Sequence, residues 1–83
     1  MKYLIMCRSL TYAQKAERLL ERAGIYAALA KAPQGITPEG CSYGVRVQEK
    51  NLQKALGLLR ASGIKTGRIY AISAEGEAQE VKL

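Results

Sequence analysis

Residues 19–25 read LLERAGI, and residues 58–64 read LLRASGI. The two segments share the pattern LLxxxGI, which is an internal repeat. Gly24 and Gly63 fall where a left-handed residue closes a helix, because glycine takes that backbone conformation without a steric penalty. The repeat therefore predicts two helices, each of which ends at its glycine.

Apolar residues at helical spacing precede both glycines. Their stripes are Ala13, Ala16, Leu20 and Ala23 in the first copy, and Leu52, Ala55, Leu56 and Leu59 in the second. Ser9 or Thr11 is a candidate cap for the first helix, and Asn51 for the second. Four β-prone segments flank these helices: 2–8, 25–31, 42–48 and 68–73.

The resulting order, β-α-β-β-α-β, predicts an α+β ferredoxin-like sandwich with two helices on one face of a four-stranded antiparallel sheet. We assign residues 1–74 to this domain. Residues 75–83 form a polar, acidic tail that frays or adds a weak edge strand.

Alignment of the repeats pairs Leu4 and Met6 with Tyr43 and Val45. If these four side chains face the helices, Cys7 points to the opposite face; a shift of one residue in either strand reverses this. The uncovered face of so small a domain could support a homodimer. Its predicted lining consists of Tyr3, Ile5, Tyr70 and Ile72.

Composition excludes several classes of function. The chain has 83 residues, no histidine and two cysteines that lack a CxxC spacing. We therefore expect no metal site, no cofactor and no Cys-His or Ser-His catalytic pair, so hydrolase-type nucleophilic catalysis lacks its base. The apolar runs are too short to span a membrane, and no signal peptide is evident, so a cytoplasmic protein with reduced thiols is expected.

The formal net charge is +6, which suggests an anionic ligand or partner, or simply serves solubility. Nucleic acid is not the expected partner. The chain has no phenylalanine, and Tyr43-Gly44 is all that remains of the aromatic signature on the third strand of RNA-recognition domains.

Residues 32–41 form the expected functional loop. Pro33 and Pro38 exclude both helix and central strand, and the segment ends on Cys41. Cys41 is a candidate reactive thiol, although a free cysteine is also a common small buried residue; Cys7, in an apolar strand, is expected in the core. The predicted topology places both cysteines at one end of the sheet, together with the start of the first helix and the cations Arg8, Lys31, Lys65 and Arg68.

The chain resembles the putative selenium/sulfur carrier protein-like family. Residues 3–9 and 13–20 are similar to the first strand and helix of that family, and residues 33–42 to its P-R-x-I-S-x-x-C-G loop, with Gln34 in place of arginine and Ser42 in place of glycine. The resemblance implies that Cys41 carries sulfur or selenium and that a cysteine desulfurase or another relay protein is the partner. The alternative is a non-catalytic ligand-binding or protein-interaction module. The residues expected to assist at the site are Lys31, Pro33, Gln34, Thr37, Ser42, Arg8 and Cys7.

Overall fold

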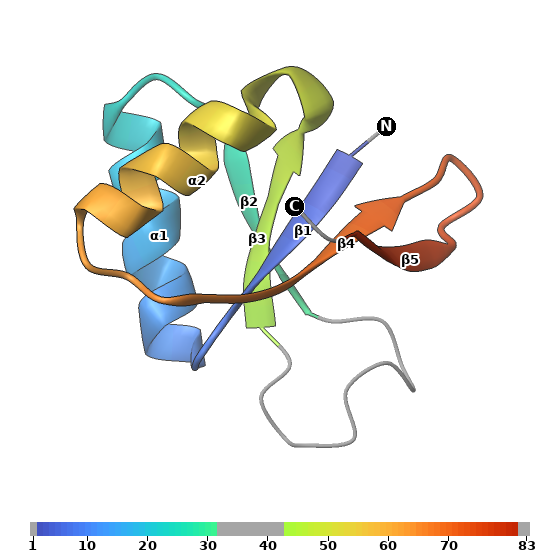
Figure 1. Ribbon diagram of the computed structural model, residues 1–83, viewed down its shortest axis with the longest axis horizontal. Coiled ribbons are helices and arrows are strands. Elements are labelled where there is room, and N and C mark those ends of the chain that lie inside the picture. The colour runs from blue at the N-terminus through green and yellow to red at the C-terminus, as the bar shows by residue number, and fades with distance from the viewer. Residues whose placement is uncertain (1, 32–42, 82–83) are drawn as a thin grey trace.

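The computed structural model describes residues 2–31 and 43–81. Two helices pack on one face of an antiparallel sheet whose strand order is β2-β3-β1-β4-β5 (Figure 1). As predicted, β3 lies between β1 and β2 and runs antiparallel to both. The elements, in chain order, are β1 (Lys2–Cys7), α1 (Leu10–Arg22), β2 (Ala27–Lys31), β3 (Tyr43–Gln48), the 3-10 turn η1 (Glu49–Asn51), α2 (Leu52–Ala61), β4 (Thr66–Ile72) and β5 (Ala78–Val81).

The repeated LLxxxGI segments end both helices in the same way. Gly24 and Gly63 have φ values of 81° and 77°. In α1, the N–H of Gly24 donates to the Glu21 carbonyl at 3.0 Å, and the N–H of Ile25 donates to the Leu20 carbonyl at 2.9 Å. The corresponding groups of α2 form the same two bonds. This is the Schellman arrangement, in which the leucine and the isoleucine of the motif also meet in the core.

The two helices begin differently. The Ser9 hydroxyl accepts a hydrogen bond from the Tyr12 N–H at 3.4 Å, which confirms Ser9 as the cap of α1. Asn51 stands at the cap position of α2 but makes no side-chain capping bond. Instead η1 leads from β3 into α2, so the second copy of the repeat has an additional turn that the first copy lacks.

The sheet has five strands, whereas the sequence predicted four. After a turn in which Gly76 adopts a φ of 86°, β5 pairs antiparallel with β4. The Ser73 N–H donates to the Glu77 carbonyl at 2.9 Å, and the Ser73 hydroxyl accepts from the Glu77 N–H at 3.1 Å. Because β5 is polar, its sequence alone gives little strand signal, and the free edge of β4 supplies its pairing partners.

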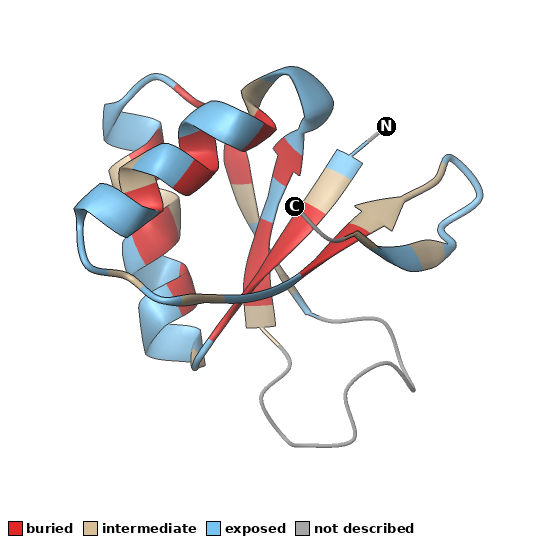
Figure 2. Cartoon of the chain, in the orientation of Figure 1, coloured by how far each residue is buried: buried red, intermediate tan, exposed pale blue. Residues whose placement is uncertain are grey.

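The main core lies between the helices and the sheet (Figure 2). On β1 it contains Ile5 and Cys7, whereas Leu4 and Met6 belong to a second cluster on the opposite face. The predicted orientation of β1 is therefore wrong. The fully buried residues of the main core with the largest side chains are Ile5, Leu20, Leu56, Leu59, Val45 and Val47.

A difference of one residue between the two repeats explains that error. Residues 8–9 connect β1 to α1, whereas residues 49–51 connect β3 to α2, so an alignment based on the helices puts the two strands out of phase by one residue. Val45 faces the helices, and Ile5, which lies opposite it in the sheet, faces them too. The additional turn before α2 displaces the second strand relative to its helix, and one residue is enough to exchange the faces of a strand. Tyr3 and Ile5 were predicted to line the open face, but they face the helices. Tyr70 and Ile72, which were predicted for the same face, do belong to the open-face cluster.

A helix side chain protects one edge of the sheet. The carboxylate of Glu17 accepts a hydrogen bond from the Leu29 N–H of the edge strand β2 at 2.9 Å. We expect Glu17→Ala to lower the free energy of unfolding by about 1 kcal/mol, since a partly exposed charge-assisted bond is lost, and to promote association through the freed edge. Urea denaturation and sedimentation measure the two effects. Glu21→Ala, one turn further along α1, is the control and should change neither quantity.

Candidate functional site

Four chain segments meet at one end of the sheet, which we call the Cys7 end. There Cys7 of β1 lies opposite Thr66 of β4, and Lys31 of β2 lies opposite Tyr43 of β3. The N-terminus of α1 follows Cys7 by a short connection (Figure 1). This clustering of strand and helix ends was predicted from the topology.

Cys7 itself is part of the core. Its side chain is 4% exposed, and its thiol lies 3.8 Å from the Ile5 carbonyl as a weak donor. Burial raises the pKa of the Cys7 thiol from 9.0 to about 11, because desolvation disfavours the thiolate. Since the thiolate is the nucleophilic form of cysteine, Cys7 is chemically inert at neutral pH.

A small basic cavity opens at the Cys7 end. It has a volume of about 110 Å³ and is lined by Arg8, Tyr12, Gly63 and Lys65. Lys15 adds a third cation, with its Nζ 5.5 Å from the centre of the Tyr12 ring. Cations beside the N-terminal turn of α1 favour an anion in this cavity.

The sequence predicted only part of this cavity. Arg8 and Lys65 were expected at this end because each adjoins the end of a strand or helix. Tyr12 and Gly63 were not among the predicted site residues. A usable signal was present for Tyr12, which lies in the first turn of a capped helix and is 38% exposed.

Lys31 belongs to a different hollow. It lines a space of about 150 Å³ on the open face of the sheet, together with Arg46, Leu4, Ala30, Ile72 and Gly76. The structure therefore assigns Arg8 and Lys31 to separate hollows, although both occur at the Cys7 end.

The remaining predicted site residues lie outside the described part of the chain: Pro33, Gln34, Thr37, Cys41 and Ser42. Within residues 2–31 and 43–81, no group of three acidic, cysteine or histidine side chains could hold a metal ion. Neither α1 nor α2, the two α-helices of the described ranges, has the length and apolar content needed to cross a membrane.

Comparison with known proteins confirms the resemblance noted in the sequence. No curated protein and no solved structure matched the chain. Residues 2–71 match a family model described as "Putative Se/S carrier protein-like", which covers every described element except β5 and the end of β4. The chain belongs to this Se/S carrier protein-like family.

Proposed function

We propose that the protein is a small sulfur or selenium carrier that uses Cys41 as its carrier thiol. The observation that supports this most strongly concerns the other cysteine. The chain has two cysteines, and Cys7 is buried with a pKa of about 11. Thiol exchange at neutral pH needs a thiolate, so Cys41 is the cysteine available for it. Membership of the Se/S carrier protein-like family supports the same assignment.

The proposed transfer is a balanced exchange of one sulfur atom. The Cys41 thiolate attacks the terminal sulfur of a persulfide on a donor such as a cysteine desulfurase. A new S–S bond forms on Cys41, the S–S bond of the donor breaks, and the donor cysteine leaves as a thiolate. No external oxidant or reductant is required, and a selenium atom would follow the same course.

The other predicted site residues would assist this exchange. Pro33 and Pro38 limit the backbone freedom of the segment that carries Cys41. Gln34, Thr37 and Ser42 supply polar groups close to Cys41 in sequence, and Lys31 and Arg8 supply positive charge that favours a thiolate.

Loading by a desulfurase tests the proposal. After incubation with a cysteine desulfurase and cysteine, we expect the intact protein to gain the mass of one sulfur atom, located on Cys41 by peptide mass spectrometry. Cys41→Ser should gain none. Cys7→Ala is the matched control and should still be loaded, because Cys7 lies in the core. Failure of the wild-type chain to accept sulfur, or loading that survives Cys41→Ser, would remove the proposal.

The second candidate is a binding module without transfer chemistry. It is favoured by the basic cavity beside Arg8 and Lys65, which offers an anion a site with no cysteine among its described lining residues. A binding module keeps its function in Cys41→Ser, whereas a carrier loses it, so the same variant separates the two.

A homodimer through the open face remains a prediction. The apolar cluster beneath that face contains Leu4, Met6 and Tyr70, which are buried within the single chain, and the partly exposed Ile72 packs against it. Sedimentation at high protein concentration measures the oligomeric state directly, and a monomer at every concentration would contradict the predicted dimer.

A further inference from the structure

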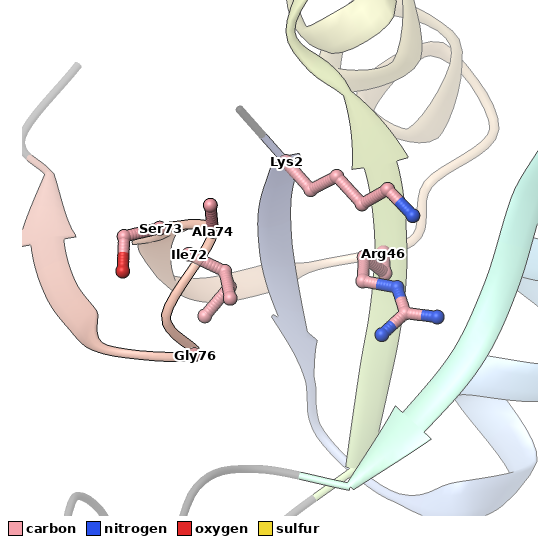
Figure 3. A pocket seen from close by; sticks show the side chains of 6 residues that line it. All are labelled: Lys2, Arg46, Ile72, Ser73, Ala74 and Gly76. Carbon is pink, nitrogen blue, oxygen red and sulfur yellow. The ribbon is translucent and has the colours of Figure 1, made fainter.

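A groove crosses the open face of the sheet beneath the turn between β4 and β5 (Figure 3). Its volume is about 450 Å³, and its lining comes from β1, β3, the end of β4 and the turn: Lys2, Arg46, Ile72, Ser73, Ala74 and Gly76. The 150 Å³ hollow beside Lys31 shares Arg46, Ile72 and Gly76 with it. The two spaces therefore adjoin, and we refer to them together as the groove. Its size is within the range of small-molecule sites.

The groove is positively charged. Lys2 and Arg46 come from the neighbouring strands β1 and β3, and their side chains extend in the same direction (Figure 3). Neither side chain forms an ion pair or a hydrogen bond with another described residue. Glu80, which lies opposite Tyr70, is the carboxylate of β5 on this face, and it lines neither space. Two neighbouring cations without a counter-charge among the described residues favour an anionic ligand.

The floor of the groove is apolar. Leu4, Ala30 and Ile72 line it, and all three belong to the open-face cluster. Such a floor beside two cations suits a ligand that has both a charged head and an apolar body.

Tyr70 lies in the same cluster, beneath the groove. It is 3% exposed, it lines neither space, and its hydroxyl has no hydrogen-bond partner among the described residues. Because this hydroxyl is itself buried, it does not contact a ligand in the groove, and the two cations and the apolar floor define the site.

Nucleic acid fits this face poorly. Single-stranded RNA is bound on open sheets by exposed aromatic rings on which bases stack. Among the described residues, Tyr70 is buried, and Tyr3 and Tyr43 pack against the helix-side core. The open face therefore has cations but no exposed ring of the kind that stacking needs.

We propose that the groove binds a small amphipathic anion. Its carboxylate or phosphate head lies between Lys2 and Arg46, where the guanidinium matches either group in geometry. Its hydrocarbon or aromatic body covers Leu4, Ala30 and Ile72. This site does not involve Cys41 and does not depend on the proposed carrier function.

Octanoate is a suitable probe, because it combines a carboxylate with a flexible apolar chain. We expect octanoate to bind the full chain at least about tenfold more tightly than acetate, which lacks the body, or octanol, which lacks the charge. Amide chemical-shift changes should map to β1, β3 and the β4–β5 turn. Calorimetry or the same shifts give the affinities.

Substitutions locate the site. Arg46→Gln and Lys2→Gln should each weaken octanoate binding about tenfold or more, since each removes a charge-assisted contact. Both residues are exposed, so neither change threatens the fold. Lys54→Gln, an exposed cation of α2, is the matched control and should have no effect. Cys41→Ser should bind octanoate normally, which separates this result from the carrier hypothesis.

Tyr70→Phe tests the hydroxyl. Because the group has no described partner, its removal should leave the melting temperature of the free protein unchanged or higher. Because the hydroxyl is buried and lines neither space, octanoate binding should stay the same. A lower melting temperature without ligand would show that the hydroxyl is already paired.

Three results would overturn the proposal. Octanoate could bind no better than acetate and octanol, or Arg46→Gln and Lys2→Gln could leave its affinity unchanged. A single-stranded oligonucleotide could also bind more tightly than octanoate with the same dependence on Arg46, which would assign the groove to nucleic acid instead.

Discussion

Gly44→Ala should destabilise the protein by about 2–3 kcal/mol, which is large for a single methyl group. Gly44 lies on β3 opposite Met6 of β1, where the two backbones approach closely. A Cβ at position 44 would collide with the carbonyl group of Ile5 and would lie 3.0 Å from the Cα of Met6. Backbone atoms of a central strand cannot move aside as the end of a side chain can. The expected fall in melting temperature is on the order of 10–20 °C for a domain of this size.

Gly57→Ala is the matched control for this prediction. Gly57 is an exposed position of α2, and a Cβ there meets nothing within 4 Å. Since alanine is the better helix former, this variant should be more stable by about 0.5–1 kcal/mol. Urea denaturation of both variants gives the comparison. Equal stability of Gly44→Ala and the wild type would show that β1 and β3 lie further apart than described.

The two cysteines should differ strongly in reactivity. With a pKa of about 11, Cys7 has a thiolate fraction on the order of 10⁻⁴ at pH 7, compared with a few per cent for an ordinary thiol. A short pulse of iodoacetamide on the native protein should therefore leave Cys7 unmodified, and unfolding in urea should expose it. Peptide mass spectrometry of Cys41→Ser, in which Cys7 is the one remaining thiol, measures the rate. Alkylation of native Cys7 at the rate found in urea would contradict its burial.

The raised pKa of Cys7 also predicts a loss of stability in alkaline solution. The folded-state pKa of about 11 exceeds the model value of 9.0, so the folded protein holds this proton more tightly than the unfolded chain does. The contribution is fully present below pH 9 and is lost as pH rises towards and through 11, by an amount on the order of 2 kcal/mol. Unfolding free energies measured at pH 8, 9 and 10 for the wild type and Cys7→Ala should converge as pH rises. Parallel pH curves would show that Cys7 titrates normally.

The helix ends were predictable because their signals are local. Each LLxxxGI segment contains the glycine that closes the helix, and the leucine and isoleucine that meet beneath it. Such a motif needs contacts only within six residues, so the sequence pattern determines the structure directly.

The faces of β1 were not predictable from the repeat. Both Leu4 and Ile5 are buried, because β1 is the central strand of the sheet. The pattern of apolar residues therefore does not show which side chains of β1 face the helices. The face on which Ile5 lies depends on its pairing with Val45, a residue far from it in the chain. The additional turn η1 makes the connection from strand to helix one residue longer in the second repeat, so the helical repeat does not give the phase of β1.

The end of the sheet at which several cations gather was predicted, but the way in which they group into hollows was not. Topology was sufficient to bring Arg8, Lys31 and Lys65 to the Cys7 end of the sheet, because strand directions follow from the order of the elements. Which hollow each cation lines depends on how the hairpin turn and the helix ends pack. The groove beside Arg46 could not be foreseen, since it requires β5 and the turn at Gly76.

The sequence by itself determined the two helices, their glycine ends, the order of the first four strands and the absence of histidine chemistry. Each of these depends on residue identity or on neighbours along the chain. Tertiary structure alone decided which side chains of β1 face the helices, how β5 pairs with β4, and that Lys2 and Arg46 line one hollow. These features depend on strand register and edge pairing, where a shift of one residue exchanges the two faces of a strand.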